Sequence, residues 1–187
     1  MDLKEKTLES TTIFEGKIIT VLLDQAELPN GSKAGREVCI HPGGVGVLPL
    51  EADGTVTLVR QYRYPMQELV LEIPAGKLDH GAESLELAAR RELSEETGLE
   101  AGEMIYLGKM YASPGFCTER IHMYLARHLK QAESHPDEDE FVEVVKMPFD
   151  ELLEQVMSGE IVDAKTVGAV LKTKVLLDRE KEEKKQG

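Results

Sequence analysis

The chain lacks the features that would assign it to a membrane or to the extracellular space. Its 187 residues include only two cysteines, Cys39 and Cys117, too few for a disulfide framework. No apolar run approaches the length of a membrane span, and the acidic start MDLKEKTLES does not resemble a signal peptide. We therefore expect a cytoplasmic protein that has no membrane partner.

Basic residues are also in short supply. Lys and Arg number 22 against 35 Asp and Glu, so the formal net charge is −13 at pH 7. This charge opposes non-specific binding to a polyanion, and we expect no nucleic acid partner. An anionic small molecule would need local arginines or bound cations. The sequence has no internal repeat, and its one biased segment is the charged tail at 178–187, which we expect to be a solvated helix end.

The order of apolar and turn-forming segments predicts an α+β fold. Helices are expected at about 85–97, at 149–157 and from about Asp163 onward, the last with Val167, Val170, Leu171 and Val175 at helical spacing. Strands are expected at 17–28, 36–42, 44–50, 55–62, 68–74, 105–112, 120–129 and 141–148, with a hairpin across Ala52-Asp53-Gly54. This order favours a mixed β-sheet sandwiched between helices (α/β/α). Residues 1–45 are expected to form a small β-sheet subdomain, and 46–187 the main domain.

The helix at 85–97 carries acidic residues where they are unfavourable. At about 100° per residue, Glu92 and Glu96 fall on or beside the face expected to pack, and Glu95 flanks them. An unpaired charge in that position is costly. Two interpretations remain open: Arg91 pairs with a neighbouring carboxylate, or a divalent cation such as Mg²⁺ binds the cluster. Arg90 and Arg91 project from other parts of the circumference, so we do not expect them to neutralise all of it.

A longer pattern bears on this choice. Residues 76–99, GKLDHGAESLELAARRELSEETGL, closely resemble the Nudix box, in which Gly, five residues, Glu and seven residues precede Arg-Glu-apolar-x-Glu-Glu-x-Gly-apolar. Every fixed position from Glu83 to Leu99 matches. Gly76 lies one residue further from Glu83 than in the family, and we expect the intervening loop to absorb the difference. The resemblance implies a Nudix fold whose box holds two or three Mg²⁺ ions, or Mn²⁺, against a pyrophosphate.

The resemblance also implies roles for individual residues. Glu92 and Glu96 would be the main metal ligands and so take part in catalysis, while Arg91 would be a structural partner of the box. An acidic loop, HPDEDE, would supply the general base and a further ligand, for which Glu138 and Glu140 are the candidates; the two roles are interchangeable. The complete expected metal set is Ala75 (through its carbonyl), Glu92, Glu95, Glu96 and Glu140.

Stretches outside the box resemble the ADP-ribose pyrophosphatase branch of this superfamily. TVTLVRQYRYPMQELVLEIPAGKLD supplies Arg63, which by resemblance contacts the diphosphate, although an ordinary surface arginine is the alternative. YASPGFCTERIHMYLA supplies Pro114, in a turn that would line the substrate pocket, and Glu119, which would reach a ribose hydroxyl or be a surface acid. REVCIHPGG supplies Arg36, which in relatives reaches the substrate of a partner chain across a homodimer of exchanged N-terminal strands.

The resemblance therefore implies Mg²⁺-dependent hydrolysis of ADP-ribose to AMP and ribose 5-phosphate. Two alternatives remain. One is hydrolysis of another nucleoside diphosphate sugar such as GDP-mannose. The other is a non-catalytic domain that senses nucleotide sugars, which the retention of Glu92, Glu95 and Glu96 disfavours.

Overall fold

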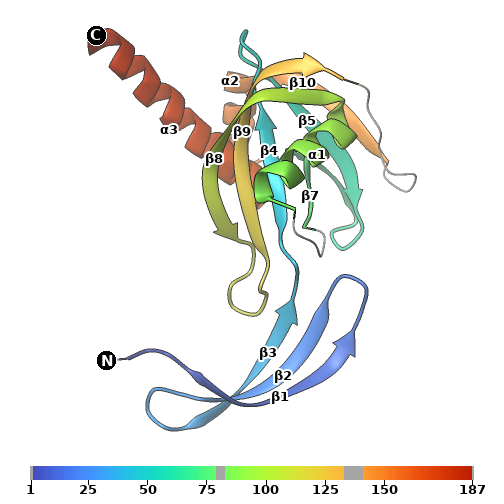
Figure 1. Cartoon of the computed structure of the whole chain (residues 1–187), viewed down its shortest axis with the longest axis vertical. Coiled ribbons are helices and arrows are strands. Elements are labelled where there is room, and N and C mark those ends of the chain that lie inside the picture. The colour runs from blue at the N-terminus through green and yellow to red at the C-terminus, as the bar shows by residue number, and fades with distance from the viewer. Residues whose placement is uncertain (1, 79–82, 133–140, 187) are drawn as a thin grey trace. The chain divides into compact units, whose positions relative to one another are not determined.

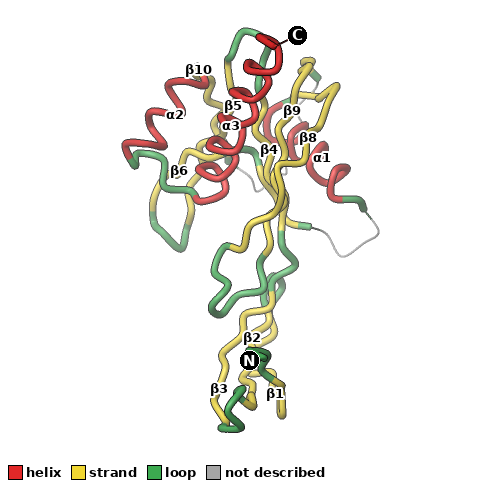
Figure 2. The backbone as a smooth tube through the Cα atoms, turned by 90° about the vertical axis from the view of Figure 1, so that its left-hand side faces the viewer, coloured by secondary structure: helices red, strands yellow, loops and turns green. Residues whose placement is uncertain are grey.

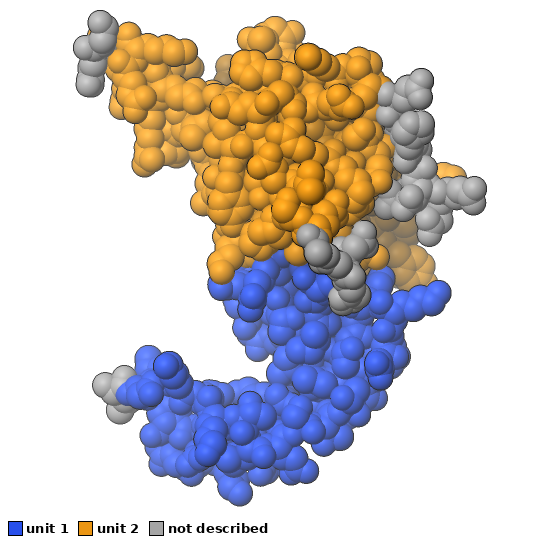
Figure 3. Space-filling view, in the orientation of Figure 1, with its two compact units in different colours: residues 1–43, 111–120 blue, residues 44–110, 121–187 orange. Residues whose placement is uncertain are grey.

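The computed structural model describes residues 2–78, 83–132 and 141–186. Within it the chain forms two compact units, shown in different colours in Figure 3. The first contains residues 1–43 and 111–120, and the second contains residues 44–110 and 121–187. The first unit thus includes the 111–120 segment, which the sequence pattern had assigned to the main domain.

The first unit is built on a three-stranded antiparallel sheet in the order β1-β2-β3 (Figure 1). Its strands are β1 (Lys6–Glu15), β2 (Thr20–Glu27) and β3 (Lys33–Ile40). Strand β1 is not among the strands expected from the sequence, because KTLESTTIFE lacks an apolar alternation. In the structure every one of its residues is exposed, which explains why the alternation is missing. The segment 111–120 adds to this unit through backbone bonds: Cys39 N–H donates to Phe116 O at 2.7 Å, and Thr118 N–H donates to Cys39 O at 2.9 Å.

The second unit contains two sheets. One has the order β7-β4-β9-β8, with β4 (Gly44–Pro49) parallel to β9 (Arg120–Gln131) and antiparallel to β7 (Ala75–Lys77). Strand β8 (Leu99–Tyr111) completes it. The other sheet is antiparallel with the order β10-β5-β6, made of β5 (Thr55–Arg63), β6 (Glu68–Glu72) and β10 (Val142–Pro148). The mixed sheet expected from the sequence is therefore present.

Helices cover β4 from both sides, as Figure 2 shows. Val45 and Val47 pack with Ala89 and Leu93 of α1 (Leu85–Thr97), in a cluster of their own. Leu48, on the opposite face of β4, belongs to a larger cluster with residues of α2 (Phe149–Ser158) and α3 (Ala164–Gln186). Because side chains alternate along a strand, β4 is buried on both faces. This arrangement confirms the expected α/β/α architecture. None of the helices in the described ranges combines the length and the hydropathy of a membrane-spanning segment.

One expectation about the second unit was wrong. Strands β4 and β5 do not form a hairpin, because they enter different sheets after a single bridge between Leu50 and Val56. The turn between them does close, with Gly54 N–H donating to Glu51 O at 3.1 Å, but a turn does not determine which partner each strand takes. The helix expected from about Asp163 onward is present as α3. Of its residues at helical spacing, Val170 lies in the core, while Leu171 and Val175 are exposed by 39% and 51%.

Helix α1 carries the acidic cluster and is capped at both ends. Ser84 accepts a hydrogen bond from Leu87 N–H at 3.2 Å, which satisfies one of the free N–H groups of the first turn. At the other end Gly98 adopts φ 66° and ψ 26°, a left-handed conformation, and its N–H donates to Ser94 O at 2.8 Å. The caps define where the helix starts and stops, and hence where its carboxylates lie.

Replacing Gly98 with alanine is expected to destabilise the protein by about 1–2 kcal/mol, because a Cβ is strained at a left-handed position. Urea unfolding monitored by circular dichroism measures the change. Gly35→Ala is the matched control, since Gly35 has open space beside its Cα and no left-handed φ, and should change stability by less than about 0.5 kcal/mol. Equal stabilities for the two variants would contradict the capping assignment.

Candidate active site

The carboxylates of Glu92 and Glu96 lie on the buried face of α1, as the helical spacing predicted. Glu92 is 7% exposed and Glu96 is 4% exposed, and they share that face with Ala89 and Leu93. Glu95 is only partly buried. Since removing a carboxylate from water is costly, each buried one requires strong compensating interactions.

Arg91 supplies part of that compensation. Its Nη1 lies 2.9 Å from both Glu92 Oε1 and Glu95 Oε2, and its Nε lies 3.6 Å from Glu83 Oε1. Burial alone would lower the pKa of Arg91, but the charges of Glu92 and Glu95, the hydrogen bond that Arg91 donates to Glu95 and the charge of Glu83 outweigh it and raise the pKa. The first of the two interpretations left open by the sequence, pairing of Arg91 with a neighbouring carboxylate, is therefore present, because a long, flexible arginine reaches around the helix to carboxylates on its border.

The backbone of β7 provides a second form of compensation. Ala75 N–H donates to Glu96 Oε2 at 2.9 Å. At Gly76 the approach is so close that an added Cβ would lie 2.0 Å from Glu92 Cδ. Residues 75–76 of β7 are therefore packed directly against both buried carboxylates of α1. The additional residue between Gly76 and Glu83 does not displace Gly76 from the helix, and residues 79–82 themselves lie outside the described ranges.

The donors gathered here have the chemistry that a hard cation requires. Glu92, Glu95, Glu96 and the Ala75 carbonyl are oxygen ligands of the kind that Mg²⁺ prefers, and the missing Cβ of Gly76 lets the Glu92 carboxylate lie directly against the backbone. Within the ranges that the structure describes, no three His, Cys, Asp or Glu side chains are arranged as a preformed metal site. The residues fit magnesium by chemistry, and binding would require Arg91 and the carboxylates to rearrange.

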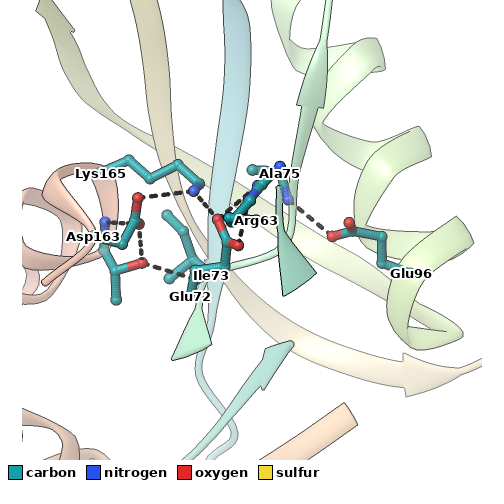
Figure 4. Close-up of polar contacts among 8 residues, drawn as sticks. Arg63, Glu72, Ile73, Ala75, Glu96, Asp163 and Lys165 are labelled. Carbon is teal, nitrogen blue, oxygen red and sulfur yellow. Dashed lines mark hydrogen bonds and ion pairs between the residues drawn. The ribbon is translucent and has the colours of Figure 1, made fainter. Parts of the chain in front are cut away.

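A buried ionic network lies beside the box, and Figure 4 shows its members. Glu72, at the end of β6, is 1% exposed and accepts two hydrogen bonds from Arg63: from Nε at 2.8 Å and from Nη2 at 2.7 Å. Lys165, in the first turn of α3, also donates to Glu72 Oε2 and lies 3.0 Å from Asp163 Oδ1. Two cations and two carboxylates thus form one connected group.

The network affects the ionisation of Arg63. Burial alone would lower the pKa of its guanidinium, but the hydrogen bonds and charge of Glu72, with smaller contributions from Asp163 and Glu96, raise the pKa above its ordinary value. Arg63 therefore stays cationic at any physiological pH. Its side chain is 41% exposed, so it also faces solvent. These properties suit an arginine that contacts an anionic ligand.

Sequence reasoning missed Glu72, Asp163 and Lys165. The available signal was a glutamate next to Ile73 at the end of an apolar strand, ELVLEIP, where an unpaired charge is unfavourable. Its partner Lys165 lies far along the chain, so the pairing itself could not be read from local pattern.

The other expected site residues lie in the first unit or outside the described ranges. Arg36 forms a bidentate pair with Glu5, at 2.9 and 2.6 Å. Pro114 lies in a turn in which Cys117 N–H donates to Ser113 O at 2.9 Å. Glu119 lies 3.6 Å from His41 Nδ1. Glu138 and Glu140, the candidates for the base and a further ligand, fall in 133–140, which the structure does not describe.

Comparison with known proteins identifies the family. Residues 40–167 match the model of the NUDIX domain, and residues 5–38 match that of the nucleoside diphosphate sugar hydrolase N-terminal domain. The chain is 44% identical to the ADP-ribose pyrophosphatase of Bacillus subtilis (strain 168), over 90% of this chain and 91% of that protein. It is 42% identical to the methanol dehydrogenase activator of Bacillus methanolicus, over 89% of this chain and 91% of that protein.

A solved structure agrees on the fold. The crystal structure of an ADP compounds hydrolase superposes with a TM-score of 0.83 at 24% sequence identity, covering 95% of this chain and 96% of that one. The NUDIX match alone includes the box, both buried carboxylates of α1 and the network around Glu72. The chain therefore belongs to the Nudix hydrolase family.

Proposed function

We propose that this protein hydrolyses the pyrophosphate bond of ADP-ribose in a Mg²⁺-dependent reaction that yields AMP and ribose 5-phosphate. The observation that carries the proposal is the pair of buried carboxylates, Glu92 and Glu96, held against the Ala75–Gly76 backbone. The similarity to the Bacillus subtilis ADP-ribose pyrophosphatase along nearly the whole chain supports this choice of substrate.

Two or three Mg²⁺ ions, or Mn²⁺, would neutralise the diphosphate, polarise its phosphorus and lower the pKa of a bound water. The protein would hold them through Glu92, Glu96, Glu95, the Ala75 carbonyl and Glu140. Arg63 would contact the diphosphate and stabilise the charge that develops on its oxygens. Glu138, or Glu140 if the two roles are exchanged, would take the proton of the attacking water. Hydrolysis by water needs no covalent enzyme intermediate.

The proposal extends to the substrate's surroundings. The turn that contains Pro114 would line the substrate pocket. Glu119 would contact a hydroxyl of the ribose. Arg36 would contribute to the site of a partner chain in a homodimer formed through the N-terminal strands, and the exposure of all ten residues of β1 supports a partner there. The strongly acidic chain is compatible with an anionic substrate because bound cations reverse the local field. A cytoplasmic location suits this metabolite-directed role.

A turnover screen tests the substrate and the metal together. ADP-ribose, GDP-mannose and ADP-glucose are each incubated with the protein in Mg²⁺ or in EDTA, and the nucleoside monophosphate released is measured. We expect the highest kcat/KM for ADP-ribose and loss of turnover in EDTA. A preference for GDP-mannose would replace the substrate in the proposal. Turnover of no compound in Mg²⁺ or Mn²⁺ would instead favour a sensing domain.

Glu96→Gln should lower kcat by at least about a hundredfold, because a neutral amide replaces a charged ligand of nearly the same shape. The fold should persist, since the amide oxygen can still accept from Ala75 N–H. The control is Glu86→Gln on the same helix, whose exposed side chain pairs with Arg90. Initial rates and thermal melts are compared for both. Near-full turnover by folded Glu96→Gln would remove Glu96 from the metal set.

Gly76→Ala should also lower turnover by roughly a hundredfold. The Glu92 carboxylate would have to move to make room for the new Cβ, and a misplaced catalytic group loses rate. Steady-state kinetics at saturating Mg²⁺ measure the loss. Gly35→Ala, where a Cβ meets open space, is the control and should keep full activity. If Gly76→Ala keeps wild-type kcat, the close packing of β7 on Glu92 has no catalytic importance.

A further inference from the structure

The buried network around Glu72 contains a lysine to which neither the Nudix box nor the proposed reaction assigns a role. Lys165 is 7% exposed, far less than is usual for a lysine. Its ammonium bonds Glu72 and Asp163, and its stem passes close to Gly46 of β4, where an added Cβ would lie 3.7 Å from Lys165 Cδ. Burying this side chain requires compensation from both carboxylates, so its placement has a cost that a surface lysine would avoid.

The partners of Glu72 determine the charge that Arg63 has to balance. Arg63 donates through Nε and Nη2, so Glu72 does not occupy Nη1, the remaining nitrogen of the guanidinium. Lys165 donates to Oε2, the same oxygen that accepts from Nη2. The negative charge of Glu72 is thus shared by two cations, one of which, Lys165, also pairs with Asp163. Without Lys165, the four-charge group would lose one cation, and Arg63 would be the remaining cation beside both Glu72 and Asp163.

The first turn of α3 also fixes the strand that leads to the box. Asp163 Oδ2 accepts from Thr166 N–H at 2.9 Å, and Thr166 Oγ1 accepts from Ile73 N–H at 2.9 Å. Ala75 N–H then donates to Glu96. Figure 4 shows these contacts following one another from α3 to α1 along residues 72–75. Lys165 therefore belongs to an assembly that holds Arg63 on one side and the box on the other.

We propose that Lys165 is a positioning residue for Arg63: by balancing the buried Glu72, it leaves the exposed side and the charge of the guanidinium to the diphosphate of the substrate. This inference rests on the proposed function, since it assumes that Arg63 contacts a diphosphate. Lys165 itself does not need to touch the substrate. Its effect on binding is electrostatic and is transmitted through Glu72.

The first test is Lys165→Met, which keeps the length of the stem and removes the charge. We expect KM for ADP-ribose to rise by about tenfold or more, because Glu72 now neutralises Arg63, while kcat changes by less than about threefold. The separate variant Lys165→Arg keeps the positive charge, so its KM should stay within about threefold of wild type. The control is Lys172→Met, an exposed lysine of the same helix, which should leave both constants unchanged.

A second variant separates this role from a purely structural one. In Glu72→Gln/Lys165→Met the buried charge and its extra cation are removed together, so Arg63 is no longer neutralised and KM should return to within about threefold of wild type. If Lys165 bound substrate directly, the double variant would keep the raised KM. In this variant the fully buried residue 72 is neutral, and Asp163 keeps its hydrogen bonds from Thr166, so it provides a folded test where Lys165→Met unfolds.

A third comparison asks whether Lys165 acts through Arg63. In an Arg63→Gln background, adding Lys165→Met should change KM by less than about twofold, whereas independent effects would multiply. The inference is overturned if folded Lys165→Met has wild-type KM, if the double variant with Glu72→Gln keeps the raised KM, or if the effects of Arg63→Gln and Lys165→Met multiply.

The wild-type protein in the same assay distinguishes the two levels of failure. An active wild type with any of these contrary variant results overturns only the role of Lys165. A wild type that turns over no nucleoside diphosphate sugar overturns the proposed function and the inference with it.

Discussion

The second unit depends on one constraint: a carboxylate withdrawn from water must have partners strong enough to replace its hydration. Glu72, Glu92 and Glu96 are each less than a tenth exposed. Their partners come from β5, β7, α1 and α3, so satisfying the three charges joins elements that are far apart in the sequence. The polar interior of the unit thus restricts how its helices and strands pack around the box more narrowly than apolar packing alone would.

The helix at the centre of the site could be predicted well because its signals are local. Ser84 and Gly98 mark the ends, and the period of 3.6 residues places Glu92 and Glu96 on the face of Leu93. The burial of these charges could therefore be predicted from the amino-acid sequence alone. The pairing of Arg91 with neighbouring carboxylates was one of the two interpretations that the sequence left open, and the structure shows it with Glu92 and Glu95. A helical wheel could not decide between the two, because it records the direction of Cβ and ignores the length of the side chain.

Non-local features were predicted poorly, for physical reasons. The turn at 52–54 is real, yet β4 and β5 separate into different sheets because β4 finds its neighbours in β7 and β9. Strand β1 has no apolar alternation and is held by backbone pairing with β2, which composition does not reveal. In the site, the pairing of Glu72 with Lys165 crosses the whole box in sequence. The local sequence shows only that Glu72 is a charged residue in an apolar strand, where burial is costly. It does not show which residue pairs with Glu72.

The buried carboxylates Glu72 and Glu96 have different kinds of partner, and this difference indicates different roles. Glu72 is held by two cations, which offset its charge, so its oxygens are committed to arranging Arg63 and α3. The bond from Ala75 to Glu96 is different, because a neutral N–H orients a carboxylate without cancelling its charge. A carboxylate oriented in this way retains its attraction for a divalent cation. The raised pKa of Arg63 includes a contribution from Glu96, so the fields of the two groups overlap. One region of the unit therefore holds a solvent-facing guanidinium and an oriented, buried carboxylate close enough to influence each other, as the proposed binding of a diphosphate with its counterion would require.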